Sequence, residues 1–391
     1  MRRIVLMILS VCFLCVGIFC YPENVEAKAM VLIPNNINAQ SYIVIDNNGK
    51  ILIEKNADEK KPVASICKLM TTLITLEKIE RGELSLEDKM LASDYACSVE
   101  GSQAFLDTGS EYLVKDLLKS VIVASANDSA IVLAENISGT ENDFVDIMNQ
   151  KAQEMGMYST IYANSTGLTD KNIQYSTAKD TSLILNKITE FDTYKEYCSI
   201  WMDKLIHPSG RETELVNTNR LIRYLPYCVS GKTGFTDEAK YCLASTANKN
   251  DLKLTCVVLG CDSASDRFTD SINLYNFTYA NFKNNKLISK GDKLERSVSV
   301  NRGVEEFVGV QFEQDFNWTS RVGKDVDFNV VYNLPEAISA PISEGDTIGT
   351  ADIYLGTEYI GSVNLVSTKE ISEQKFADVM DKIITKFGFL N

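Results

Sequence analysis

Three short motifs in a fixed order constrain the fold of this chain more than any other feature of its sequence. Each motif is weak alone, because Ser-x-x-Lys recurs at Ser176 and Ser372, and Ser-x-Asn recurs at Ser271, Ser299 and Ser362. Lys-Thr-Gly, by contrast, occurs once, and the ordered triple is unique in this sequence. The three motifs are Ser65-Ile66-Cys67-Lys68, Ser125-Ala126-Asn127 and Lys232-Thr233-Gly234. If they act together, the fold must bring three distant segments into one cleft.

The residue types in the triple fit nucleophilic catalysis. A serine hydroxyl is a weak nucleophile and needs a base beside it. We expect Ser65 to open a helix, so that Lys68 shares its face and backbone N–H groups point at the reacting carbonyl. The Lys68 amine can act as the base if burial, or a second cation such as Lys232, lowers its pKa. Ser125 could relay a proton between the lysine and the leaving amine.

The remaining motif residues fit substrate binding. Asn127 offers a donor and an acceptor to a substrate amide. Lys232 and Thr233 would meet a carboxylate, and a strand starting at Lys232 presents edge backbone groups to an extended peptide. Taken singly, each motif has a structural explanation: Ser65 as an N-cap, Lys68 on a solvated face, and Lys232-Thr233-Gly234 as a turn.

Charge and composition exclude several other classes. The formal net charge of −14 argues against nucleic acid as a partner. His207 is the only histidine, which excludes a multi-histidine metal site. No Cys-x-x-Cys pair follows residue 27, so zinc is not expected, and we predict neither a metal nor an organic cofactor. Most of the seven cysteines beyond residue 27 are expected to be small buried hydrophobes, and one disulfide bridge stays open.

The two ends of the chain carry segments typical of secretion and of surface binding. Arg2 and Arg3 precede an apolar run, and a small-residue site ends at Ala27, so residues 1–27 are predicted to be a secretory signal peptide; the alternative is an uncleaved anchor. Residues 369–391 are predicted to hold an amphipathic helix. Its apolar stripe would lie in the membrane interface or dock on the chain's own β-domain. The stripe consists of Phe376, Val379, Met380, Ile383, Ile384 and Phe387.

Between these ends the patterns predict two domains. Residues 41–45 and 51–54 flank a turn and indicate a hairpin, 65–81 have helical spacing, and several helices are expected between 112 and 192. Strands are predicted at 241–246 and 253–259, and a helix at 267–282. From residue 289 the pattern alternates as in strands, which indicates a separate small β-domain.

Residues from about 41 to 285 resemble the D-alanyl-D-alanine carboxypeptidases, the low-molecular-mass penicillin-binding proteins of serine peptidase family S11. The triple carries this resemblance, together with four further segments: Pro62 to Ser65, Asn164 to Leu168, Tyr175 to Asp180 and Asn217 to Leu221. The resemblance implies an α+β fold of the β-lactamase/DD-peptidase type, with an antiparallel sheet flanked by helices and a helical subdomain. It implies a catalytic domain at 28–288, an all-β domain at 289–368 and a C-terminal amphipathic helix.

By this resemblance, Ser65 is the acylated nucleophile and Lys68 its base, while Ser125 and Asn127 line the cleft. Lys232 and Thr233, with Gly234, bind the terminal carboxylate, helped by Arg267, and the N–H groups of Ser65 and Phe235 form the oxyanion hole. The sequence departs from the family at Cys67, for which we expect core packing, and at Tyr227 to Gly231.

The implied reaction is removal of the terminal D-alanine from peptidoglycan stem peptides ending in D-Ala-D-Ala, with β-lactams as covalent inhibitors, at the outer face of the cytoplasmic membrane or in the cell wall. A class A β-lactamase is disfavoured, because no Glu-x-x-Leu-Asn segment lies between Asn127 and Lys232. A wall-binding or β-lactam-sensing protein without turnover stays open. A Ser-His-Asp or Cys-His hydrolase would have to use His207, which the polar turn Ile206 to Gly210 predicts to be a solvated surface residue.

Overall fold

The computed structural model describes residues 34, 36–168 and 174–387. The predicted signal peptide at 1–27 lies outside these residues. Within the described part of the chain, no helix is long and apolar enough to cross a membrane.

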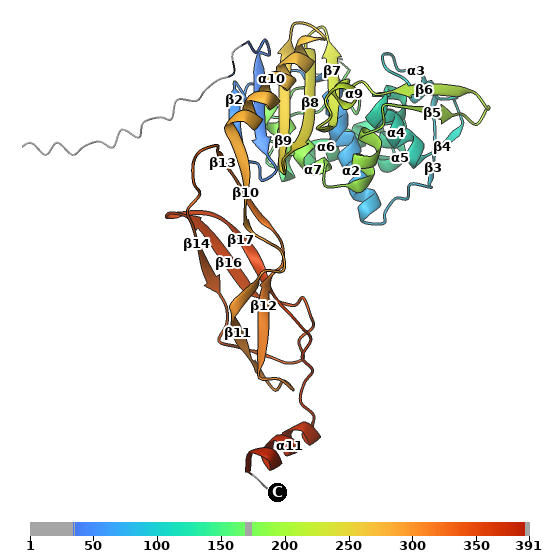
Figure 1. The fold of residues 1–391 in the computed structure, drawn as a ribbon. Coiled ribbons are helices and arrows are strands. Elements are labelled where there is room, and N and C mark those ends of the chain that lie inside the picture. The colour runs from blue at the N-terminus through green and yellow to red at the C-terminus, as the bar shows by residue number, and fades with distance from the viewer. Residues whose placement is uncertain (1–33, 35, 169–173, 388–391) are drawn as a thin grey trace, which may run out of the picture. The chain divides into compact units, whose positions relative to one another are not determined.

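A five-stranded antiparallel sheet with the order β2-β1-β9-β8-β7 forms the centre of the first domain. It consists of β1 (Ser41–Asp46), β2 (Ile51–Lys55), β7 (Cys228–Thr236), β8 (Lys240–Lys249) and β9 (Leu252–Cys261). Every residue of β1 is buried, because successive side chains of a strand point to opposite faces and both faces are covered. The helices α10 (Asp266–Asn281) and α7 (Ala178–Ile188) cover opposite faces of the sheet (Figure 1). Tyr42 and Val44 belong to the core cluster on the α10 side, and Ile43 and Ile45 to the cluster on the α7 side.

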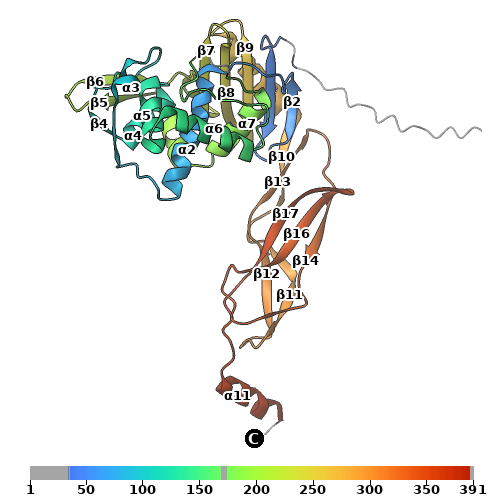
Figure 2. The ribbon, with the colours of Figure 1, turned by 180° about the vertical axis from the view of Figure 1, so that it is seen from behind.

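A helical subdomain shares the core that lies on the α7 side of the sheet. It contains α2 (Lys68–Glu80), α3 (Asp94–Ser98), α4 (Val114–Val123), α5 (Asn127–Ser138), α6 (Glu141–Glu154) and α8 (Asp192–Cys198). Two small antiparallel sheets accompany these helices: β3 (Lys89–Leu91) with β4 (Glu111–Leu113), and β5 (Met202–Ile206) with β6 (Glu212–Val216). The short helix α9 (Leu221–Tyr224) precedes β7. Figure 2 shows this subdomain beside the sheet from the opposite side.

The second domain is built from strands and has a core of its own. A six-stranded sheet has the order β14-β16-β17-β12-β11-β15. Its strands are β11 (Lys293–Asn301), β12 (Phe307–Phe312), β14 (Phe328–Asn333), β15 (Ala337–Ser339), β16 (Thr347–Leu355) and β17 (Glu358–Ser367). A separate pair joins β10 (Phe282–Ile288) to β13 (Phe316–Arg321), and the helix α11 (Phe376–Phe387) follows. The predicted fold class, a mixed α/β catalytic domain followed by an all-β domain, is confirmed.

Two local predictions need correction. The helix expected at 65–81 begins as an α-helix only at Lys68, and Ser65 belongs to the 3-10 turn η1 (Ala64–Cys67). Ala64, the first residue of η1, has a φ of +49°, outside the right-handed helical region, so a regular α-helix does not begin there. The patterns also gave no sign of β10, because Phe282–Ile288 has no strict alternation of polar and apolar residues.

Candidate active site

Ser65 lies directly beside a buried lysine. The Nζ atom of Lys68 is 3.0 Å from Ser65 Oγ and donates to the Thr166 carbonyl oxygen at 2.6 Å. Burial lowers the pKa of Lys68 to about 7, because removing an ammonium group from water disfavours its charged form. A large fraction of this amine is therefore neutral near neutral pH and able to accept the Ser65 proton.

Two glycines allow other segments to pack closely against the turn that carries Ser65. A Cβ atom on Gly167 would lie 2.0 Å from the Ala64 carbonyl oxygen and 2.9 Å from the Ser65 nitrogen. A Cβ atom on Gly234 would lie 2.5 Å from the Val63 carbonyl oxygen. Since real side chains do not approach so closely, both positions require glycine, and η1 is held between the segment at 164–168 and β7.

The second and third motifs meet across the cleft from Ser65. Lys232, on β7, donates through Nζ to Ser125 Oγ at 2.6 Å and to the Thr233 carbonyl oxygen at 2.9 Å. Ser125 has a φ of +62°, a left-handed conformation that is uncommon for serine. Burial, followed by the positive charges of Lys68 and Arg267, lowers the pKa of Lys232. Lys68, Lys232 and Arg267 form no ion pair with any carboxylate of the described residues, so the site favours an anionic ligand.

Asn127, the first residue of α5, is held by the loop that precedes β4. Its backbone N–H donates to the Ser102 carbonyl oxygen at 2.7 Å, and its Nδ2 donates to the Glu100 carbonyl oxygen at 2.6 Å. Its Oδ1 is buried and has no hydrogen-bond partner among the described residues. Because a buried acceptor without a partner is costly, this oxygen is suited to accept an N–H group from a substrate.

Ser65, Ser125 and Asn127 line one cavity of about 460 Å³, and Lys68 and Lys232 lie behind it, bonded to the two serines. β7 is an edge strand of the sheet, as predicted, so its outer backbone groups are free of a neighbouring strand. Thr233 Oγ1 donates to Thr218 Oγ1 at 2.7 Å, and the Arg267 guanidinium donates to the Gly234 carbonyl oxygen at 3.1 Å. The cavity is lined by Ser65, Gly101, Ser102, Ser125, Asn127, Leu168, Thr218, Thr233, Gly234, Phe235 and Arg267.

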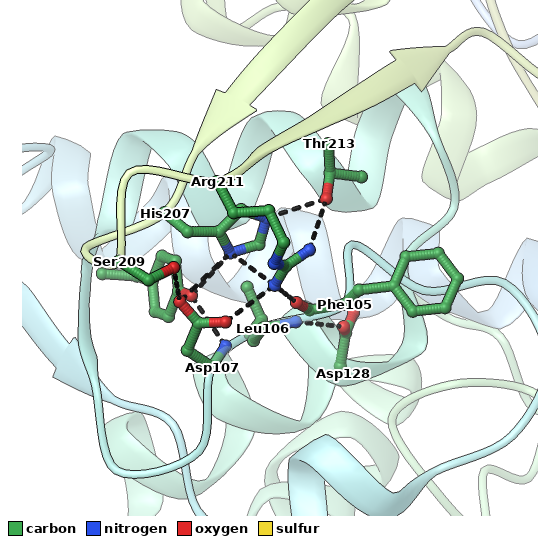
Figure 3. Close-up of polar contacts among 9 residues, drawn as sticks. Phe105, Leu106, Asp107, Asp128, His207, Ser209, Arg211 and Thr213 are labelled. Carbon is green, nitrogen blue, oxygen red and sulfur yellow. Dashed lines mark hydrogen bonds and ion pairs between the residues drawn. The ribbon is translucent and has the colours of Figure 1, made fainter.

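The structure contradicts the prediction for His207. This histidine is only 2% exposed, because the turn between β5 and β6 folds back against the loop before β4 (Figure 3). Its Nδ1 is 2.8 Å from the Tyr112 hydroxyl and its Nε2 is 2.8 Å from Thr213 Oγ1. A polar turn pattern gives no information about what the turn packs against, which is why the sequence suggested a solvated residue.

Two further predictions concern the cysteines and the second Ser-x-x-Lys motif. Cys67 donates through Sγ to the Asn164 carbonyl oxygen at 3.2 Å, and burial raises the pKa of its thiol to about 12, so it is a packing residue. All seven cysteines of the described residues are unpaired. Ser176 is buried away from Lys179, whose Nζ lies 3.2 Å from Asp58, so this motif forms no catalytic pair.

Several residues of the site were not assigned a role by sequence reasoning. The Thr166 carbonyl, the Thr218 hydroxyl and the backbone of Gly101 and Ser102 all contact motif residues or line the cavity. Asn164 to Leu168 and Asn217 to Leu221 carry part of the family resemblance, but the sequence assigns no role in the site to Thr166 or Thr218. Backbone carbonyls leave no signal in a sequence, so Thr166 could not have been found through its residue type.

The site combines a serine beside a buried lysine, a second lysine bonded to a second serine, and an edge strand. This combination is the one expected of an active-serine peptidase of the penicillin-recognising fold. Comparisons with known proteins make this specific. Residues 26–263 match the family model of D-alanyl-D-alanine carboxypeptidase, peptidase S11. Residues 282–373 match the model of the C-terminal domain of penicillin-binding protein 5.

Individual relatives agree with the family models. The chain is 31% identical over 366 residues to the D-alanyl-D-alanine carboxypeptidase DacF of Bacillus subtilis. The aligned residues cover 93% of this chain and 91% of that protein. The solved structure of penicillin-binding protein 5 from Haemophilus influenzae superposes with a TM-score of 0.69 at 29% identity. The match covers 88% of this chain and 100% of the Haemophilus chain. The structure of PBP3 from Streptococcus pneumoniae has a TM-score of 0.73 at 27% identity, and covers 86% and 100%.

The chain therefore belongs to the D-alanyl-D-alanine carboxypeptidases of peptidase family S11, within the low-molecular-mass penicillin-binding proteins. It is a serine D-Ala-D-Ala carboxypeptidase that acts on peptidoglycan. The predicted enzyme class is confirmed.

Proposed function

We propose that the enzyme removes the terminal D-alanine of peptidoglycan stem pentapeptides through an acyl-enzyme on Ser65. The neutral Lys68 amine takes the Ser65 proton as Oγ attacks the penultimate carbonyl carbon. The C–N bond to D-alanine then breaks, and the leaving nitrogen takes up a proton relayed through Ser125. Water, deprotonated by the same base, cleaves the ester and restores Ser65.

The observation that carries this proposal is the 3.0 Å approach of Lys68 Nζ to Ser65 Oγ, together with the lowered pKa of that lysine. A base with a pKa near the working pH combines the correct protonation state with a useful driving force for proton transfer. Backbone N–H groups of Ser65 and Phe235, which both line the cavity, would stabilise the oxyanion.

Arg267, which lines the cavity, and Lys232, which bonds the cavity residue Ser125, support a peptide that ends in a carboxylate. Lys232, Thr233 and Arg267 would hold this group, and the Asn127 Oδ1 would accept an N–H of the substrate backbone. A β-lactam carries a carboxylate beside a strained amide, so we propose that penicillin acylates the same serine. Arg267 is suited to this role because it is half-buried beside β7 and donates to Gly234.

We further propose that the enzyme works at the outer face of the cytoplasmic membrane, exported by residues 1–27 and held by α11. Phe376 is 81% exposed, and Val379 and Met380 are also exposed, which favours a lipid interface over docking on the β-domain. Co-sedimentation with vesicles of mixed zwitterionic and anionic lipid tests this. The full mature chain should sediment and a chain ending at Lys375 should not; equal sedimentation would contradict the anchor.

Intact mass after incubation with a penicillin tests the nucleophile. We expect wild-type protein to gain one adduct and Ser65→Ala to gain none, whereas Ser176→Ala, which removes the other Ser-x-x-Lys serine of this domain, should still be acylated. An adduct on Ser65→Ala, or no adduct on either protein, would refute the assignment. Release of D-alanine from a diacyl tripeptide ending in D-Ala-D-Ala, again lost in Ser65→Ala, would then establish turnover.

A further inference from the structure

The turn at 207–211, which joins β5 to β6, is bonded to the loop that forms one wall of the active-site cavity (Figure 3). Arg211 donates through one nitrogen to the Phe105 carbonyl oxygen and to Asp107 Oδ1, the latter at 2.7 Å. Ser209 Oγ donates to Asp107 Oδ2 at 2.6 Å. Both oxygens of this carboxylate are therefore occupied by the hairpin, and these bonds lower the pKa of Asp107 to about 2.

His207 is the buried centre of this contact. Its Nδ1 lies 2.8 Å from the Tyr112 hydroxyl and 3.2 Å from an Arg211 nitrogen. The opposite ring nitrogen, Nε2, faces Thr213 Oγ1 at 2.8 Å. The Tyr112 hydroxyl in turn accepts the Asp107 backbone N–H at 2.8 Å. The ring thus links the hairpin to the loop on a second path.

The other side of the same loop is bonded to the start of α5. Asp128 accepts the N–H groups of Ala104 and Leu106, at 3.0 Å and 3.2 Å. Asn127 donates to the carbonyl oxygens of Glu100 and Ser102. The loop at 100–107 is therefore held between the hairpin turn and the first two residues of α5, Asn127 and Asp128.

The loop conformation needs this support. Phe105 has a φ of +58°, a strained conformation for an aromatic residue, and its ring is 59% exposed, so packing of the ring does not hold it in place. Gly101 has a φ of +86°, and a Cβ atom there would lie 2.8 Å from Asn127 Nδ2. A shift of this loop would therefore move the groups that orient the Asn127 amide, and Gly101 and Ser102 would move as cavity walls.

We propose that Arg211 is a positioning residue of the acyl-transfer site, which fixes the loop at 100–107 through Asp107 and Phe105 and thereby orients the Asn127 side chain. This inference rests on the proposed role of Asn127 in substrate binding. Arg211 itself does not line the cavity. Its effect on the reaction passes through the loop.

The test measures the second-order rate constant for acylation by a penicillin, followed by intact mass, in four proteins. Arg211→Gln should lower this constant about tenfold, since small misplacements of a binding group have large kinetic effects. In an Asn127→Ala background the same change should have an effect of less than about twofold, because the group through which Arg211 acts is gone. An equally large effect in both backgrounds, or none in either, would overturn the proposal.

Lys204→Gln is the matched control, since Lys204 lies on the same hairpin and pairs with the exposed Glu212 at 2.7 Å without touching the loop. It should leave acylation within about twofold of wild type. Amide hydrogen exchange at Ala104 and Leu106 should accelerate in Arg211→Gln and not in Lys204→Gln; unchanged exchange in Arg211→Gln contradicts the proposal.

If Arg211→Gln does not fold, Ser209→Ala removes a single hydrogen bond to Asp107 from an exposed side chain. It should lower acylation about threefold, and again only when Asn127 is present. Acylation of Ser65 itself is established separately with Ser65→Ala. Wild-type acylation on Ser65 combined with no coupling between positions 211 and 127 would therefore refute this inference and leave the proposed function intact.

Discussion

Lys68 illustrates how burial changes the acid–base chemistry of a common residue. The sequence contains other lysines three residues after a serine, yet Lys179 pairs with Asp58 at the surface, whereas Lys68 is fully buried beside Ser65. Desolvation is the first cause of its lowered pKa. The chemistry of the pair is therefore a property of the site rather than of the motif.

The first prediction concerns pH. Because the neutral amine is the base, the rate of Ser65 acylation by penicillin should rise with pH and level off above the Lys68 pKa of about 7. Below that pKa it should fall about tenfold per unit of pH. Acylation rates across this range, measured by intact mass, check the profile. A rate that does not change with pH would show that Lys68 is not the titrating base.

The second prediction concerns Gly167. Gly167→Ala should lower acylation about a hundredfold, because the new Cβ atom would collide with the backbone that carries Ser65. Gly156→Ala is the control: Gly156 also has a positive φ, +74°, but nothing lies within 4 Å of its Cβ position. Both changes share a strain cost of about 1–2 kcal/mol. Similar acylation by the two variants would mean that strain alone, and not the contact with Ser65, is responsible.

At the level of elements, β7 and the β5–β6 hairpin have different relations to the site. β7 contributes Lys232, Thr233 and Gly234 directly, and its position at the sheet edge leaves room for a peptide. The hairpin contributes no cavity residue, but its turn buries His207 against the cavity wall. Secondary structure alone does not distinguish these roles; the contacts of each turn do.

The third prediction is a pH dependence of stability caused by His207. Burial, and then the Arg211 charge, lower its pKa in the folded protein, with Asp107 and Asp128 opposing; Tyr112 is the remaining titratable group that faces the ring. The unfolded chain takes up the proton at about pH 6.5, while the folded protein resists it. The stabilisation is therefore complete above about pH 6.5 and is lost as the pH falls through the folded pKa.

Urea unfolding of wild type and His207→Gln at about pH 7.5 and about pH 5 checks this prediction. The free energy of unfolding should fall more between these two values in the wild type than in His207→Gln. Asp107 does not interfere, since its pKa of about 2 lies below this range. Equal pH dependence in the two proteins would show that the ring is protonated equally well in both states.

At the level of the whole molecule, the apolar cores are separate. Two clusters of buried side chains are formed only by residues of the first domain, and the third only by residues from Ile288 onward. A domain with its own core is expected to fold alone. No residue of the β-domain lines the active-site cavity.

The fourth prediction follows from these separate cores. A chain that ends at Ile288 should fold, and its acylation by penicillin should stay within about twofold of the full chain. Intact mass and a thermal unfolding curve measure both properties, with Ser65→Ala in the shortened chain as the control for adduct specificity. Loss of acylation from a folded fragment would show that the β-domain supports the catalytic site.

Features that are local in the chain and leave a pattern of residue types could be predicted. They include the order of the three motifs, the hairpin at 41–54, the strands β8 and β9, and the change of pattern near residue 289. The predicted site residues meet at one site as expected: they are Ser65, Lys68, Ser125, Asn127, Lys232, Thr233, Gly234, Phe235 and Arg267. The 3-10 turn at Ser65, the Thr166 carbonyl bonded to Lys68 and the burial of His207 depended on contacts between distant segments. Which carbonyl bonds a side chain, which residue takes a left-handed conformation and what a turn packs against all depend on which surfaces meet in three dimensions. Only the tertiary structure determines these features.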